Sequence, residues 1–186
     1  MRTHMDKKII RKQAIEKSKS IKDKQVKETS IVKTLLSICS KYNRIGVYLA
    51  KDNEVNINSL INLLFMSKKR VFAPKITQNE IKFIEISDLS TDSFTINNYG
   101  IREPLSNKHI EYDDLDLIIV PGVAFDRLMD RLGHGKGYYD KYLLNFKGVK
   151  VGVCFEETLF EELPTDSHDI KVDMVVTDKQ TIKNRD

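Results

Sequence analysis

Apolar residues along the chain repeat with two different periods. Helical spacing predicts two helices near the N-terminus, whose apolar faces are Ile9–Ile15 and Ile31–Cys39, and later helices near 60–64 and 138–144. Short runs rich in β-branched residues predict buried strands between these helices. The predicted strands cover residues 45–49, 70–73, 81–86, 115–120, 149–154 and 174–176, with a short helix near 159–163.

Alternation of buried strands with amphipathic helices predicts an α/β fold. We expect a three-layer α/β/α arrangement around an open, mostly parallel sheet of the Rossmann-like kind, with strand 81–86 at an edge. Residues 87–112 are polar and lack a period, so an irregular excursion is expected there, and a long loop is expected over 121–137. Residues 1–186 are interpreted as one domain, with a helical arm over about 5–41 packed on or beside the sheet.

Composition excludes several classes of protein. The chain is 40% hydrophobic and holds only 8 Gly and 4 Pro, which is compatible with a packed core and not with general disorder. No apolar run reaches the roughly 18 residues of a membrane span, so we expect a cytoplasmic protein without a membrane partner. Cys39 and Cys154 are too few for a disulfide framework and are interpreted as reduced structural thiols.

Charge is concentrated near the N-terminus. Residues 1–27 carry ten Lys or Arg against three acids, a net charge of +7, whereas the rest of the chain is mildly acidic. A basic arm of this kind suits an anionic partner such as a nucleotide, a polycarboxylate ligand or nucleic acid, and a solvated helix face would give the same pattern. Aromatic residues are not interleaved with these lysines, so we expect no nucleic-acid partner.

The segment after the strongest predicted strand holds the clearest candidate chemistry. Gly133, Gly135 and Gly137 alternate with polar residues just before a predicted helix. Glycines allow main-chain amides to approach a ligand closely, and a helix N-terminus favours an anion. The spacing is neither that of a P-loop, because Lys136 is followed by glycine, nor that of the dinucleotide fingerprint. A phosphate-binding loop is the interpretation we favour over a simple turn.

Four segments together resemble the 5-formyltetrahydrofolate cyclo-ligase (methenyltetrahydrofolate synthetase) family. They are KKIIR at 7–11, YLAKDNEV at 48–55, RLGHGKGYYD at 131–140 and KVD at 171–173. The glycine-rich string is specific to the family, and the four segments follow in order over nearly the whole chain. The resemblance implies conversion of 5-formyltetrahydrofolate to 5,10-methenyltetrahydrofolate, with ATP as co-substrate and Mg²⁺ as cofactor, in a monomer that acts on small molecules, with polyglutamylated folate as a further expectation.

The resemblance also assigns roles to residues of this chain. It implies catalytic contributions from Lys136, Arg131 and Tyr138, and magnesium ligation by Asp140 and Asp173. The implied ATP-binding residues are Lys7, Lys8, Ile9, Ile10, Arg11, Arg131, Leu132, Gly133, His134, Gly135, Lys136, Gly137, Tyr138 and Tyr139. The implied folate-binding residues are Arg11, Leu49, Glu54, His134, Gly135, Lys136, Gly137 and Tyr138.

Each assignment has a plainer alternative. Glu54 could be an acid that favours a helix dipole, and Asp173 could be a polar residue at a strand edge. Adjacent helical residues diverge by roughly 100°, so one of Tyr138 and Tyr139 is expected in the core. His134 is assigned no proton transfer. At the level of function, a non-catalytic nucleotide-binding module or a sugar-phosphate isomerase or CoA-transferase-like enzyme on the same kind of sheet stays open.

Overall fold

A mixed eight-stranded sheet runs through the centre of the protein. The structure is a computed structural model that describes residues 6–90, 93–98, 100–107, 109–110 and 114–183. The strands follow in the order β13-β12-β10-β7-β1-β2-β3-β6. Their bounds are β1 Arg44–Gly46, β2 Arg70–Thr77, β3 Glu80–Ile86, β6 His109–Ile110, β7 Leu117–Val120, β10 Val149–Val153, β12 Met174–Val176 and β13 Thr181–Lys183.

Parallel pairing dominates the middle of this sheet. Strands β12, β10, β7, β1 and β2 pair in parallel, and β13, β3 and β6 add antiparallel pairs at the two sides. The predicted α/β fold with a mostly parallel sheet is therefore confirmed. Strand β3 was expected at an edge, but β6 pairs with its outer side. Residues 109–110 are too short to carry a periodic signal, which is why β6 was not predicted.

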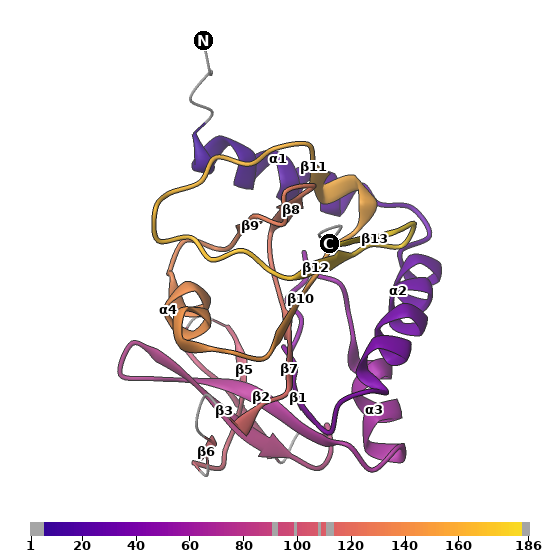
Figure 1. Cartoon of the computed structure of the whole chain (residues 1–186), viewed down its shortest axis with the longest axis vertical. Helices are drawn as coiled ribbons and strands as arrows, with labels where there is room; N and C mark the ends of the chain where they lie inside the picture. The colour runs from indigo at the N-terminus through magenta and orange to yellow at the C-terminus, as the bar shows by residue number, and fades with distance from the viewer. Residues whose placement is uncertain (1–5, 91–92, 99, 108, 111–113, 184–186) are drawn as a thin grey trace.

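Helices cover both faces of the sheet. Helices α2 (Lys24–Cys39) and α3 (Asn58–Met66) lie on one face, and α4 (Tyr138–Asn145) lies on the other (Figure 1). Strand β7 shows how one apolar run serves both faces, because successive side chains point to opposite sides. Leu117 and Ile119 pack in the cluster under α2 and α3, whereas Ile118 and Val120 pack in the cluster under α4.

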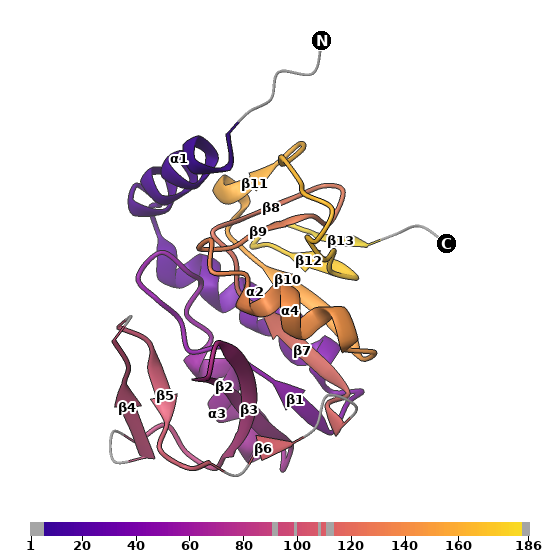
Figure 2. The same cartoon turned by 90° about the vertical axis from the view of Figure 1, so that its left-hand side faces the viewer.

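A second, three-stranded sheet carries the N-terminal helix. Strands β11 (Leu159–Phe160), β8 (Ala124–Asp126) and β9 (Arg131–Leu132) pair in that order, and helix α1 (Lys7–Lys19) packs beside them (Figure 2). Ile10 and Ala14 of α1 are fully buried in a small apolar cluster, separate from the two main ones, that they share with residues of β8 and β9. The predicted loop over 121–137 is thus wrong in part, since it contains β8 and β9.

Two further differences concern irregular segments. The helix expected near 159–163 is wrong, because a 3₁₀ turn, η3 (Glu156–Thr158), precedes it and residues 159–160 form β11. The excursion over 87–112 contains a small antiparallel ladder of β4 (Phe94–Ile96) and β5 (Arg102–Pro104), besides β6. None of the helices in the described ranges is both long and apolar enough for a bilayer crossing.

Both cysteines are buried free thiols. Cys39 and Cys154 lie in the two main core clusters and form no disulfide. Burial raises the pKa of Cys39 to about 12 and that of Cys154 further still, because a thiolate would lose its hydration. A protonated buried thiol reacts poorly, which agrees with the structural role expected of both residues.

Asp126 organises the turn after β8 in the three-stranded sheet. Its side chain is fully buried, and Oδ1 accepts hydrogen bonds from the main-chain N–H groups of Leu128 and Asp130, at 2.9 and 2.8 Å. Oδ2 accepts one from Leu163 N–H at 2.7 Å. Burial raises the pKa of Asp126 although these N–H donors act in the opposite direction. One carboxylate therefore satisfies donors from two segments that are far apart in the sequence.

We predict that Asp126→Ala lowers the free energy of unfolding by about 3 kcal/mol or more, because it leaves several buried N–H groups without an acceptor. Urea unfolding followed by circular dichroism measures the change. Asp114→Ala is the matched control, since that carboxylate is exposed. Equal stability of the two variants would contradict this role for Asp126.

Candidate active site

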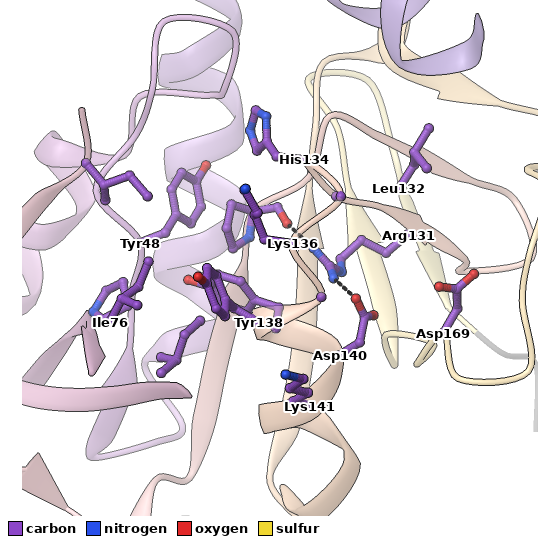
Figure 3. Close-up of a pocket in the computed structure, with 18 of the residues that line it drawn as sticks. Tyr48, Ile76, Arg131, Leu132, His134, Lys136, Tyr138, Asp140, Lys141 and Asp169 are labelled. Atoms are coloured by element: carbon purple, nitrogen blue, oxygen red, sulfur yellow. Dashed lines mark hydrogen bonds and ion pairs between the residues drawn. The ribbon is translucent and has the colours of Figure 1, made fainter. Parts of the chain in front are cut away.

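A cavity of about 790 Å³ lies beyond the carboxyl ends of the parallel strands. Pro121 follows β7, and Tyr48 and Leu49 follow β1, so the position is the one expected for ligands in open α/β sheets. Figure 3 shows the side chains around it. The lining residues are Lys7, Arg11, Tyr48, Leu49, Lys51, Glu54, Pro74, Ile76, Ile81, Ile101, Glu103, Pro121, Arg131–Lys141, Leu144, Asp166, His168 and Asp169.

Most of the predicted site residues meet in this cavity. Every residue from Arg131 to Asp140 lines it, as do Lys7, Arg11, Leu49 and Glu54. Lys8 and Ile9 do not, because they point to solvent on the outer side of α1, and Ile10 is fully buried beneath that helix. A helix offers one face to a ligand. Of the segment 7–11 that the resemblance implied for ATP, Lys7 and Arg11 are therefore the residues that line the cavity.

The glycine-rich segment has the backbone that its sequence requires. Gly135 and Gly137 have φ angles of +94° and +69°, in the left-handed region that other residues avoid. At Gly133 a Cβ atom would lie 2.8 Å from Nη1 of Arg131, so a side chain there would collide with the guanidinium. Gly137 immediately precedes α4, and the first amides of that helix border the cavity.

Arg131 is a buried cation beneath this loop. Its side chain is only 5% exposed; Nη2 donates to Asp140 Oδ2 at 2.8 Å and Nη1 to the carbonyl of Pro121 at 3.2 Å. The guanidinium carbon lies 5.5 Å from the centre of the Tyr139 ring. These contacts tie the end of β7, the glycine loop and the first turn of α4 together. Arg131 and Asp140 face each other in Figure 3.

Two cationic side chains of helix α1 close one side of the cavity. Arg11 Nε donates to the carbonyl of Gly133 at 2.8 Å. Lys7 Nζ lies 2.6 Å from Asp166 Oδ2 and 2.5 Å from Asp169 Oδ2. Burial alone would lower the pKa of Lys7, but the bonds to Asp166 and Asp169 outweigh it, and the pKa is raised. The basic arm thus contributes two specific cations to the site.

The acidic cluster that faces Lys7 was not predicted from the sequence. Asp166, His168 and Asp169 offer ligand atoms that lie within 4.8 Å of one another. Asp173, which the resemblance implied as a metal ligand, does not line the cavity. Its carboxylate accepts hydrogen bonds from Lys150, at 2.7 Å from the main-chain nitrogen and 3.2 Å from Nζ. Asp173 precedes β12, at the opposite end of the strands from the glycine loop.

Glu54 is a buried acid at the edge of the apolar part of the cavity. Its side chain is 6% exposed, with Oε1 at 3.1 Å from His134 Nε2 and Oε2 accepting from Lys51 N–H at 2.9 Å. Burial and the nearby Glu54 charge raise the pKa values of Tyr48 and Tyr139. Of the two adjacent tyrosines, Tyr139 has its hydroxyl group buried, whereas both rings border the cavity.

The opposite wall is apolar and comes from segments that the sequence did not single out. Pro74 and Ile76 of β2, Ile81 of β3 and Ile101 before β5 form this wall, and Figure 3 shows Ile76 on the side of Tyr48 and Tyr138. The cavity therefore has a cationic, amide-rich wall beside an apolar wall. A ligand with an anionic part and a flat, weakly polar part would match both.

The chain is similar to known proteins in both sequence and structure. The profile of the 5-formyltetrahydrofolate cyclo-ligase family matches residues 3–178. A probable 5-formyltetrahydrofolate cyclo-ligase of Schizosaccharomyces pombe is 36% identical over 177 residues, which cover 87% of this chain and 84% of that protein. The 5-formyltetrahydrofolate cyclo-ligase of Mus musculus is 32% identical, with 72% of each chain covered.

Solved structures give the same result. The 5,10-methenyltetrahydrofolate synthetase of Aquifex aeolicus superimposes with a TM-score of 0.85 at 34% identity, covering 98% of this chain and 94% of that one. The 5,10-methenyltetrahydrofolate synthetase of Mycoplasma pneumoniae superimposes with a TM-score of 0.76 at 25% identity, covering 94% and 99%. The similarity thus extends over nearly the whole of each chain.

The contacts of Arg131 generate a prediction about stability. Asp140→Ala removes the counter-charge of a buried guanidinium and should lower the free energy of unfolding by about 3 kcal/mol. Asp173→Ala should cost less than about 1 kcal/mol, because the side chain of Asp173 is 47% exposed and its ion pair with Lys150 is screened by solvent. Urea denaturation of both variants tests the difference, and a smaller loss for Asp140→Ala than for Asp173→Ala would contradict it.

Proposed function

The chain belongs to the 5-formyltetrahydrofolate cyclo-ligase family, and we propose on this basis that its cavity converts 5-formyltetrahydrofolate to 5,10-methenyltetrahydrofolate with consumption of ATP. The observation that carries the proposal is the continuity of the two walls. The amide-rich glycine loop and the apolar wall border one cavity. A triphosphate on the loop and a reduced pterin on the apolar wall could therefore bind side by side in the same cavity.

The cationic wall suits the phosphates of ATP. Main-chain N–H groups of the segment 133–137 and of the first turn of α4 can donate hydrogen bonds to phosphate oxygens. Lys136, at the tip of the loop, extends over the cavity in Figure 3. Arg11 supplies further positive charge from α1, whereas Lys7 is paired with Asp166 and Asp169 at the border of the same wall. Arg131 contributes by fixing the loop, because its guanidinium is already bonded to Asp140 and Pro121.

Asp140 and Asp169 fit a magnesium ion better than Asp140 and Asp173, the pair implied by the resemblance. Mg²⁺ prefers carboxylate oxygens and commonly shares its coordination with substrate phosphates. Asp140 and Asp169 both line the cavity. Ile170 N lies 3.5 Å from Asp140 Oδ1, so Asp169 and Asp140 are neighbours at the cationic wall. We assign these two residues to the metal in place of Asp140 and Asp173. The ion would neutralise charge on the β- and γ-phosphates when bound.

The apolar wall suits the pterin ring. Tyr138, Ile76 and Leu49 offer flat or branched apolar surface, and Glu54 offers carboxylate oxygens to N–H donors of the ring. Because Glu54 is already hydrogen-bonded to Lys51 N–H, the carboxylate is held in one orientation before a ligand arrives. The ring would thereby be fixed with its formyl group toward the glycine loop.

The proposed chemistry needs no protein nucleophile. The formyl oxygen on N5 attacks the γ-phosphorus, the bond to ADP breaks, and the phosphorylated formyl carbon becomes electrophilic. N10 then attacks this carbon, phosphate leaves with the carbon–oxygen bond electrons, and the N10 proton passes to solvent. The chain aligns the two reactants and stabilises negative charge through Lys136 and main-chain amides. His134 holds Glu54 and transfers no proton.

Other functions considered for this fold make different demands. A nucleotide-binding module would hold ATP without turnover, and a sugar-phosphate isomerase or CoA-transferase-like enzyme would act without ATP. Incubation of the purified protein with Mg-ATP and 5-formyltetrahydrofolate separates them, since only the proposed reaction produces the ultraviolet absorbance of the methenyl compound. Absence of that absorbance change would rule the proposal out.

We predict that Lys136→Ala lowers kcat/KM for methenyl formation at least 100-fold with an unchanged thermal unfolding midpoint, because the residue is exposed and serves charge stabilisation. The absorbance assay measures the rate. Lys33→Ala on the exposed side of α2 is the matched control and should leave the rate unchanged. A rate within threefold of wild type for Lys136→Ala would remove this lysine from the mechanism.

Magnesium titration tests the metal assignment. Asp169→Asn should raise the Mg²⁺ concentration for half-maximal activity at least tenfold, because one anionic ligand is lost. Asp173→Asn should give the wild-type titration curve. The reverse pattern would restore the pair implied by the sequence motif and reject Asp169.

A further inference from the structure

A second buried acid lies in the apolar wall of the cavity. Glu103 of β5 is 5% exposed and lines the cavity together with Ile76, Ile81 and Ile101. Burying a carboxylate among apolar groups is costly unless hydrogen bonds satisfy it. A buried acid whose surroundings are otherwise apolar is therefore a candidate for ligand recognition.

The hydrogen bonds of Glu103 fall on one oxygen. Oε1 accepts from the main-chain N–H of Ile76 at 2.9 Å and from Asn97 Nδ2 at 2.7 Å. No protein donor in the described part of the chain bonds to Oε2. The bonds to Ile76 and Asn97 hold the carboxylate in place and leave its second oxygen for a ligand.

Glu54 differs from Glu103 in this respect. Both oxygens of Glu54 have protein donors, one from His134 and one from Lys51. Each oxygen still has a lone pair for a ligand donor, so Glu54 can bind the amino edge of a pterin. The oxygen of Glu103 that lacks a protein donor would then face a different ring donor.

We infer that Glu103 determines specificity for the reduced state of the pterin by accepting a hydrogen bond from N8–H. The inference depends on the proposed substrate. In 5-formyltetrahydrofolate the ring donors are the 2-amino group, N3–H and N8–H, because N5 carries the formyl group. With the amino edge on Glu54, N8–H is the donor that remains. In a fully oxidised pterin N8 carries a lone pair and no hydrogen, so a carboxylate there is repelled.

Equilibrium binding without ATP tests this assignment. Dissociation constants are measured by calorimetry for 5-formyltetrahydrofolate and for fully oxidised folate, on the wild type and on Glu103→Gln. The glutamine oxygen can keep the bonds to Ile76 and Asn97, and its amide nitrogen then donates toward the cavity. We expect reduced folate to bind at least tenfold more weakly to the variant and oxidised folate to bind equally or more tightly.

Two further variants separate recognition from structure. Glu103→Ala, which removes the acceptor without adding a donor, should weaken binding of reduced folate and leave that of oxidised folate unchanged. Glu85→Gln on the exposed side of β3 is the matched control and should change neither constant. A purely structural role for Glu103 would weaken both ligands in parallel, and an unchanged ratio of the two constants in Glu103→Gln and Glu103→Ala overturns the inference.

The outcome is independent of catalysis. Wild type that prefers reduced folate through Glu103 but forms no methenyl product supports this inference and rejects the proposed reaction. Wild type that forms the product while both variants keep the wild-type ratio supports the reaction and rejects the role of Glu103.

Discussion

The buried ion pair between Arg131 and Asp140 is the constraint on which the geometry of the site depends. It joins the end of the central strand, the glycine loop and the start of α4 at a single point beneath the cavity. The glycine at position 133 follows from the same contact, because any side chain there would displace the guanidinium. The contacts of Arg131 with Asp140 and Pro121 thus lie directly against the loop. A buried pair adds little net stability, so its value here lies in fixing a unique arrangement.

The fold was predicted well wherever several apolar residues repeat in one period. The run 117–120 is apolar at each position, and the structure buries it on both faces of the sheet. Strands of two or three residues, such as β8 and β9, lie within a segment rich in glycine, proline and charge, and carry no such signal. Their pairing depends on Asp126 and on partners from residues 159–163, which only the tertiary structure brings together.

The site was predicted where its residues are adjacent in the sequence. The segment 131–140 appears as a unit because loop and helix start are continuous. Asp169 lines the cavity, but the sequence motif pointed to Asp173 instead. The two acids are four residues apart and look equivalent in the sequence. Only the structure shows that Asp173 lies directly before β12 and outside the cavity. Glu103 was missed because nothing near it in the sequence reveals burial. The amide that holds it belongs to Ile76, on another strand.

Helix α1 places Lys7 and Arg11 in the wall of the cavity. It is held by the smallest of the clusters, in which Ile10 and Ala14 meet Val123, Ala124, Leu132 and Leu163. Segments with few buried contacts open locally at lower cost than the rest of a domain. The apolar contacts behind the cavity wall that bears Lys7 and Arg11 are therefore few. In the proposed reaction, affinity for ATP would depend on how firmly this helix docks. A substitution at Ala14 would then weaken binding although the residue is buried in the cluster beneath the helix.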